Sequence, residues 1–216
     1  MATPLEKARQ NPKSMKGKIL AAARKLFGEY GFHGTTTRMI AKYVGIDIST
    51  LYYHWGEKTD LYEAVVLDIN EGLRQKLMEV EKSIKGRPLT ERLEYAIDEM
   101  TQYLFEYPQI SNMTIFRYFT KTRHKTSLDA RVPEFISDIA YSMGLASDKR
   151  RVTAEAKMKV LTIMNTMHNF VSGQSFFMPM LNLERDAYIR MVKETLKFSY
   201  VAAYARLETE GTNRNS

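Results

Sequence analysis

Residues 31–58, GFHGTTTRMIAKYVGIDISTLYYHWGEK, decide the fold of this chain. Thr36 or Thr37 can cap the first turn of a short helix, and Gly45 can end it because glycine readily adopts the positive φ of a turn. Asp47 is then a suitable N-cap for a second short helix. Two short helices joined by a glycine-containing turn of about three residues have the spacing of a helix-turn-helix. We therefore expect that motif here.

Helical periodicity continues on both sides of this stretch. An apolar stripe over 19–30 predicts a helix that Gly31 ends. Further helices are expected over about 59–84, 88–107, 109–120, 133–144, 149–177 and 184–208. The sequence shows no strand alternation and no internal repeat, so the predicted fold class is all-α.

The composition restricts the class of protein. The chain has 216 residues, of which 44% are apolar and 26% charged, a balance typical of globular proteins. It has no cysteine, which excludes disulfides, a thiol nucleophile and thiolate metal sites. The N-terminus lacks the apolar core of a signal peptide, and no apolar run approaches the roughly 20 residues that span a bilayer. We expect a cytoplasmic protein without membrane contact.

Positive charge is concentrated near the N-terminus. Residues 1–58 contain ten Lys/Arg and four Asp/Glu, so they carry +6 of the net charge of +7. Such a local excess is the electrostatic footprint of a polyanion-binding protein, with nucleic acid the first candidate. A basic arm that is merely solvated would give the same count, and charge alone does not separate the two interpretations.

The second helix of the motif carries the residues that would read bases. In a helix-turn-helix this helix lies in the major groove, and its N-terminal residues meet base edges. Ser49 and Thr50 can hydrogen-bond bases or phosphates, whereas Ile48 can make only apolar contact, such as with a thymine methyl group. Asp47 is interpreted as a cap, because a carboxylate facing phosphates would be repelled.

Side chains one turn later suit the phosphate backbone. Tyr52, Tyr53 and His54 carry hydroxyl or imidazole donors, which fix register rather than sequence. Lys58 follows at the start of the next helix, where a cation is otherwise unfavourable. Leu51 and Trp55 are interpreted as core, and a half-buried Tyr52 or an ordinary, internally bonded His54 remain alternatives.

The residues around this motif also resemble a known family. The segment ILAAARKLFGEYGFHGTTTRMIAKYVGIDISTLYYHWGEKTDLYEAV, which begins at Ile19, is similar to the N-terminal domain of TetR-family transcriptional regulators. The shared pieces, in order, are AA-x-x-LF, G-F-x-x-T-T, an I-A pair, the G-I turn, T-L-Y-x-H and K-x-x-L. Ile48 departs from the pattern, since a polar or basic residue is frequent there, and Trp55 stands where phenylalanine is usual.

The resemblance implies a homodimer in which each helix-turn-helix binds one half-site of a palindromic operator in double-stranded DNA. It also implies a small-molecule pocket in the C-terminal part. DNA contact is carried over to Thr37, Arg38, Ser49, Thr50, Tyr52, Tyr53, His54 and Lys58. We accordingly divide the chain into 1–58, a basic arm with a three-helix helix-turn-helix DNA-binding domain, and 59–216, a helical effector-binding and dimerisation domain.

The C-terminal part is rich in aromatic residues and methionine, which suit an adaptable apolar pocket. The candidate pocket residues are Tyr103, Tyr107, Phe116, Phe119, Met164, Met167, His168 and Phe176. An aromatic-rich core without a pocket is the alternative. The basic segment 121–131 interrupts the periodicity and is either a solvated loop or a receptor for an anionic end of a ligand.

The last helix carries an apolar row at spacings of three and four. In the family plan the last two long helices of each subunit form the dimer interface, which the resemblance assigns here to Ile189, Val192, Leu196, Tyr200 and Ala203. Ordinary packing within one chain is the alternative.

Together these patterns predict a dimeric repressor that a small, largely apolar or aromatic effector releases from DNA. A DNA-binding regulator without an effector is one alternative, and a helical enzyme or carrier around His168 is another. We expect no enzyme activity, cofactor or metal, because no nucleophile–base pair or metal-ligand spacing is present in the sequence.

Overall fold

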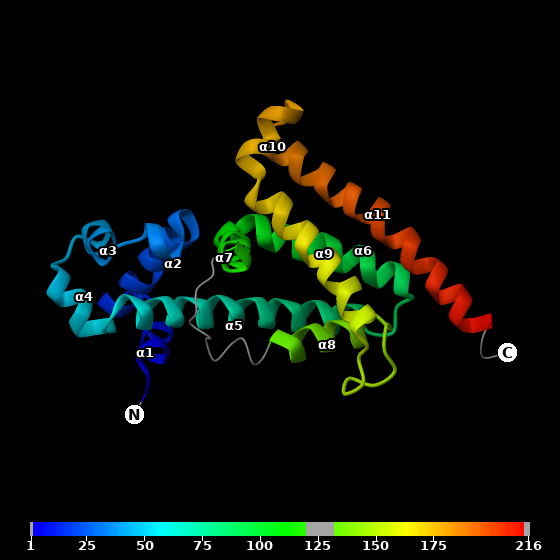
Figure 1. Ribbon diagram of the computed structural model, residues 1–216, viewed down its shortest axis with the longest axis horizontal. Coiled ribbons are helices and arrows are strands. Elements are labelled where there is room, and N and C mark those ends of the chain that lie inside the picture. Colours follow the sequence, from blue (N-terminus) through cyan, green and yellow to red (C-terminus); the bar gives the residue numbers. More distant parts are fainter. Residues whose placement is uncertain (1, 120–131, 214–216) are drawn as a thin grey trace. The chain divides into compact units, whose positions relative to one another are not determined.

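The computed structural model describes residues 2–119 and 132–213, and these residues form α-helices without any strand (Figure 1). This confirms the all-α class. The helices are α1 (Pro4–Gln10), α2 (Met15–Gly34), α3 (Thr37–Val44), α4 (Ile48–Trp55), α5 (Lys58–Ile84), α6 (Leu89–Glu106), α7 (Pro108–Phe119), α8 (Val132–Ser142), α9 (Ala154–Ser172), α10 (Gln174–Leu181) and α11 (Arg185–Asn213). The basic segment 121–131 lies outside the described residues.

By its internal contacts the chain divides into two compact units. The first comprises Met1–Arg74 and Pro108–Thr122, and the second comprises Gln75–Tyr107 and Arg123–Ser216. Helix α5 begins in the first unit and ends in the second. This division concerns packing, and the functional boundary expected after residue 58 remains a prediction.

The first unit is organised around α2. This helix contacts α1, α3, α4 and α7, and it buries Ile19, Ala23 and Phe27 completely. Gly31 has φ 68° and interrupts the helix, which resumes and ends at Gly34. The predicted end at Gly31 is therefore wrong by one short turn, although the break itself lies at that residue.

The predicted helix-turn-helix is confirmed. The Thr36 hydroxyl accepts a hydrogen bond from the Met39 N–H and so caps α3. Gly45 ends α3 in the left-handed region, with φ 77°, a conformation that only glycine adopts at little cost. Asp47 is the N-cap of α4, but its side chain makes no capping hydrogen bond.

The second unit is held together by α11, which packs against α6 and α9. Tyr188 is 1% exposed, its hydroxyl donates to the Phe170 carbonyl at 2.9 Å, and its ring meets Phe105 edge-on. Arg185 donates to the Phe105 carbonyl at 3.0 Å, which ties the first turn of α11 to the end of α6. Helix α8 packs separately on α9 through Ile136 and Ala140.

Two elements differ from expectation. A single helix over 149–177 is wrong, because the Thr153 hydroxyl caps α9 and Gly173 ends it. Helix α10 then begins afresh and continues through Pro179, which was expected to stop the chain's helix. Helix α1 was not predicted; Thr3 and Glu6 form a reciprocal capping box that stabilises it.

Candidate nucleic-acid interface

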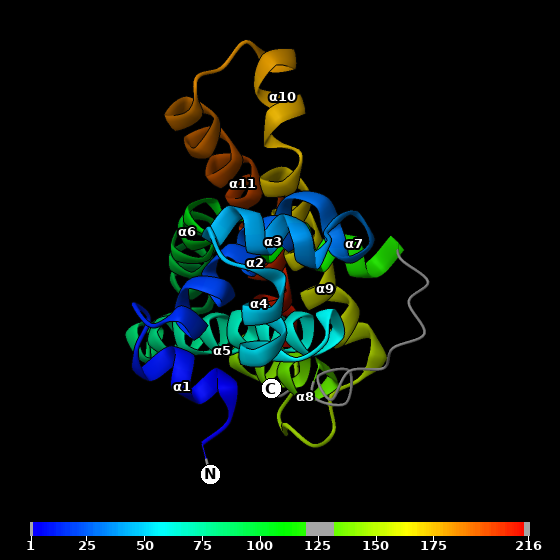
Figure 2. The same cartoon turned by 90° about the vertical axis from the view of Figure 1, so that its left-hand side faces the viewer.

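Helix α4 presents two chemically distinct faces. Leu51 and Trp55 are 0% and 5% exposed and pack into the first unit, as predicted. Tyr52 is 40% exposed and Tyr53 is 84% exposed. Figure 2 views this unit with α3 and α4 toward the reader, and α4 is uncovered on that side. An exposed aromatic face on a helix-turn-helix is available for a partner.

The first turn of α4 is also accessible. Ile48 is 37% exposed, Ser49 is exposed, and Thr50 is half-buried. The Asp47 carbonyl accepts the backbone N–H groups of Thr50 and Leu51 at 3.1 and 3.3 Å, so the backbone of this turn is satisfied without the Asp47 carboxylate. The side chains predicted to meet bases are therefore presented from a well-formed helical turn.

A polar pair joins the start of α3 to the second turn of α4. The Thr37 and Tyr52 hydroxyl oxygens lie 3.4 Å apart. Arg38, the next residue along α3, is exposed. The two hydroxyls and the exposed Arg38 guanidinium are donors suited to phosphate oxygens.

Lys16 fixes the end of α4, a role that was not predicted from the sequence. Its ammonium donates to the His54 carbonyl at 2.6 Å, and the Trp55 indole N–H donates to the Lys16 carbonyl at 3.1 Å. Burial lowers the pKa of Lys16, and the charge of Lys7 lowers it further. No pattern of neighbouring residues predicts the bonds between Lys16 and the end of α4, because the two segments are far apart in sequence.

His54 lies in an environment that disfavours its charged form. Its Nδ1 is buried and has no hydrogen-bond partner among the described residues. Burial lowers the pKa of His54, and the nearby Lys16 charge lowers it further. The ring contacts Tyr53 edge-on, with centroids 5.2 Å apart. Both effects favour the neutral form of the imidazole in the free protein.

Lys58 has protein partners that were not predicted. Its ammonium donates to the Phe32 and Thr35 carbonyls, each at 3.0 Å, and lies 4.1 Å from the centroid of the Phe32 ring. These bonds satisfy the end of α2 and explain a cation at the start of α5. One of its three protons is left for a phosphate, so this DNA contact stays a prediction.

This geometry coincides with a known protein family. Residues 19–65 match the family model of bacterial regulatory proteins, tetR family. The negative transcriptional regulator IcaR of the Staphylococcus aureus biofilm operon icaADBC is 37% identical over 93 residues, which cover 43% of this chain and 45% of IcaR. The N-terminal part of the chain therefore matches the TetR family of transcriptional regulators. The alignment spans less than half the length of IcaR, so the family assignment rests on the N-terminal part.

Solved structures extend the similarity in fold to the rest of the chain. A regulator from Clostridium perfringens has a TM-score of 0.65 at 19% identity, covering 86% of this chain and 97% of that one. A TetR-like transcriptional regulator from Rhodococcus sp. has a TM-score of 0.54 at 18% identity, covering 86% and 94%. The second unit therefore has a TetR-type helical fold.

The predicted effector residues differ in burial. Met167 and His168 are buried in α9, Tyr103 and Met164 are half-buried, and Tyr107 and Phe176 are exposed. Phe116 belongs to the first unit, where its ring lies against Gly31. The side chain of Phe119 lies outside the described residues. The grouping of all eight residues into one effector pocket stays a prediction.

His168 is the most strongly perturbed of these groups. It is 2% exposed, and burial lowers its pKa to about 4. An uncharged imidazole in an apolar core is a neutral hydrogen-bonding group, as the sequence analysis envisaged for an effector site. Its role in binding stays a prediction.

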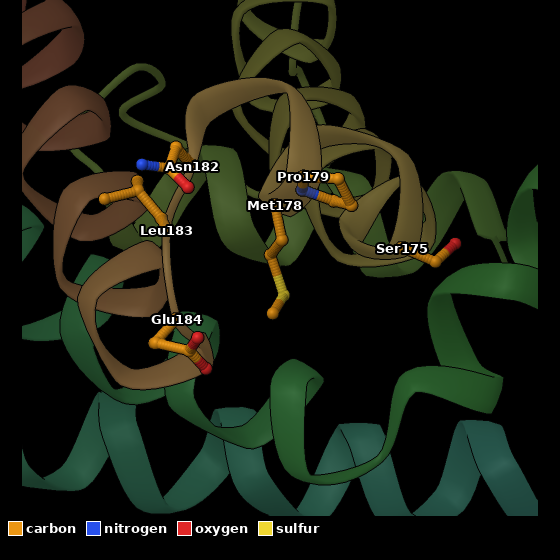
Figure 3. Close-up of a pocket in the computed structure, with 6 residues that line it drawn as sticks. All are labelled: Ser175, Met178, Pro179, Asn182, Leu183 and Glu184. Atoms are coloured by element: carbon orange, nitrogen blue, oxygen red, sulfur yellow. The ribbon is translucent and has the colours of Figure 1, made fainter.

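A shallow cleft lies at α10 and the start of α11 (Figure 3). Met178 points toward its middle. The lining residues are Ser175, Met178, Pro179, Asn182, Leu183 and Glu184. None of these residues was predicted to line a pocket. Asn182, in the left-handed region with φ 51°, ends α10 at the turn that precedes α11.

The predicted dimer residues need correction. Ile189, Val192 and Leu196 are 6%, 3% and 1% exposed within a single chain, so they form its core rather than an interface. Tyr200 is half-buried and its hydroxyl lies 2.7 Å from that of Thr166 on α9. Of the five, only Ala203 is exposed.

The exposed face of α11 carries other apolar side chains. Met191 is 44% exposed and Phe198 is 85% exposed, and seven residues, about two turns, separate them. Met158 of α9 is 63% exposed. In α10, Phe176, Met180 and Leu181 are 68%, 61% and 45% exposed. These residues form the exposed apolar surface of the second unit.

Metal binding and membrane spanning are the remaining features to consider. In the described part of the chain, no three His, Cys, Asp or Glu side chains are placed to hold a metal ion. No helix among the described residues is both long and apolar enough to cross a membrane.

Proposed function

We propose that this chain is a DNA-binding transcriptional repressor that works as a dimer and reads a palindromic operator with α4. The observation that carries the proposal is the division of α4 into a core face, with Leu51 and Trp55, and an exposed face ending in Tyr53. A helix-turn-helix places such an exposed face in the major groove. Operator binding requires the protein to meet DNA, so the proposal includes a cytoplasmic location.

Base reading is assigned to the first turn of α4. Ser49 and Thr50 donate or accept hydrogen bonds at base edges, and Ile48 contacts a thymine methyl group. Backbone contacts come from Thr37, Arg38, Tyr52, Tyr53, His54 and Lys58. His54 donates a ring N–H to a phosphate, and a nearby phosphate favours its protonation.

The dimer is assigned to the exposed apolar surface of the second unit. Phe198 and Met191 on α11 and Met158 on α9 would be costly to leave in water in such number. A second copy of the same surface covers them in a two-fold interface. Such a dimer sets the two α4 helices at a spacing of roughly 34–36 Å, one turn of DNA.

Release from DNA is assigned to a small, largely apolar effector bound in the second unit. Aromatic and methionine side chains there provide apolar contact, and His168 provides a neutral polar group. Effector binding that favours a different spacing of the two α4 helices weakens operator binding, with a coupling of about 1–3 kcal/mol. Repression rather than activation is supported by the name of IcaR, a negative regulator.

The first test is selection of duplex DNA from a random library by the full-length protein. A palindromic site bound tightly and with strong salt dependence supports the proposal, whereas indifference to sequence contradicts it. Addition of a panel of apolar compounds to the complex then tests the effector. A regulator that none of them releases would favour the alternative without an effector.

Ser49→Ala sharpens the assignment of base readout. Losing one hydrogen bond to a base edge should change the preference at a single operator position by about 1–3 kcal/mol and leave the other positions unaltered. Repeating the selection with the variant measures this. An unchanged preferred sequence would remove Ser49 from the base-reading set.

A further inference from the structure

Helix α1 is a docked element of the first unit that lies outside the family match at 19–65. Ala8 is 2% exposed against α2. Arg9 pairs with Asp68 of α5 at 2.8 Å and reaches the Leu67 carbonyl at 3.5 Å. Asp68 also pairs with Arg24 of α2. This ion-paired carboxylate, 10% exposed, therefore anchors both α1 and α2 to α5.

The connection from α1 to α2 fixes the orientation of α1. The Ser14 hydroxyl donates to the Asn11 carbonyl at 2.6 Å and accepts the Gly17 N–H at 3.2 Å. A Cβ at Gly17 would overlap the backbone of Pro12, so the connection lies directly on the first turn of α2. The backbone of α1 and of this connection is thus fixed on the first unit rather than forming a loose arm.

This element carries unbalanced positive charge. Residues 2–18 contain five Lys/Arg and one Glu, which gives +4. Arg9 is ion-paired with Asp68, and the Lys16 ammonium donates a hydrogen bond to the His54 carbonyl. Lys7 and Lys13 are exposed, and neither has an ion-pair partner among the side chains that the structure describes. Lys7 lies close enough to Lys16 for its charge to lower the pKa of that group.

One cation of this element contacts the end of α4 directly. This is Lys16, whose ammonium is bonded to the carbonyl of His54. Figure 2 shows α1 uncovered on the same side of the unit as α4. Like charges placed together repel each other in the free protein, and a polyanion removes that repulsion on binding.

We propose that α1 and its connection to α2 form a second DNA-backbone contact, in which Lys7 and Lys13 bind phosphates beside the base pairs that α4 reads. The inference rests on the proposed DNA-binding function and extends it beyond the helix-turn-helix. The contact adds affinity and salt dependence without changing sequence preference, because phosphates carry no base identity.

The test compares salt dependence in two matched double variants. Lys7→Gln with Lys13→Gln removes both proposed contacts, and Lys82→Gln with Lys85→Gln removes two exposed lysines from the second unit. Binding of the selected operator duplex is measured between about 50 and 200 mM salt. The first variant should lower the slope of log K against log salt by about 0.9 for each lost contact, nearly two in all. The control should keep the wild-type slope and affinity.

Arg9→Gln tests whether docking of α1 positions the lysines. Both lysines remain, but the bond to Asp68 is lost, so the slope should fall toward that of the lysine variant and amide exchange in α1 should rise. A wild-type slope in Arg9→Gln would overturn the positioning role of this pair.

The outcomes separate this proposal from the proposed function. If the wild type binds its selected duplex but the Lys7 and Lys13 variant has an unchanged slope, the second contact is wrong and the helix-turn-helix function stands. If the two double variants lose slope equally, the effect is one of net charge, which also overturns the proposal. If the wild type selects no duplex, both ideas fail together.

Discussion

Tyr53 on α4 and Phe198 on α11 are almost equally exposed, at 84% and 85%, but they stand among different neighbours. Tyr53 ends in a hydroxyl and lies beside His54, within a unit whose first 58 residues carry +6. Phe198 has no polar atom, and the large side chain two turns earlier on its face is Met191. The first surface suits a hydrated polyanion, and the second suits another apolar surface. An exposed aromatic side chain thus indicates a partner only when its tip and neighbours are considered.

The largest expected effect is a difference in stability between substitutions on the two faces of α4. Trp55→Ala should lower the free energy of unfolding by about 3–5 kcal/mol, because it empties a buried site and removes the bond to the Lys16 carbonyl. Tyr53→Ala should leave stability within about 0.5 kcal/mol but weaken binding to every duplex. Urea denaturation measures the stability of both variants, and titration with operator DNA measures their binding. Equal stability losses would mean that Tyr53 is also part of the core.

The corresponding pair on α11 tests the corrected interface. Leu196→Ala should cost about 2–5 kcal/mol of unfolding free energy, since Leu196 is 1% exposed within one chain. Phe198→Asp should preserve the helical circular dichroism signal and shift the protein from dimer to monomer. Light scattering measures whether the Phe198→Asp protein is a dimer or a monomer. A Phe198→Asp protein that is still dimeric would place the interface elsewhere.

His54 in the first unit and His168 in the second should make different contributions to the pH dependence of stability. The pKa of His168 is about 4 in the folded protein and about 6.5 when the chain is unfolded. The unfolded state therefore binds more protons below pH 6.5, so stability is complete above that pH and falls as the pH drops toward 4. The loss should reach about 3 kcal/mol. His54 is far less buried and should contribute little.

Denaturant titrations at pH 7 and pH 4.5 measure this loss, and His168→Gln provides the control because its side chain does not titrate in this range. The difference in stability between the two pH values should be clearly smaller in the variant. An identical pH dependence in both proteins would mean that another group is responsible.

The first unit was largely predictable because its signals are local. The cap at Thr36, the turn at Gly45 and the alternation of core and exposed residues along α4 all fall within a few turns of helix. The second unit was less predictable, because apolar side chains occur on more than one side of α11. Periodicity shows that such a helix packs, but it cannot say whether Leu196 or Phe198 faces the same chain.

The sequence by itself determined the all-α class, the helix-turn-helix and the TetR-type character of the N-terminal part, because capping residues, glycines and helical period act between near neighbours along the chain. Only the tertiary structure decided the partners of Lys58, the anchoring of α4 by Lys16, the docking of α1 through Arg9 and Asp68, and the side of α11 that is left exposed. These features depend on contacts between segments distant in sequence, where many pairings of similar chemistry are possible and packing selects one.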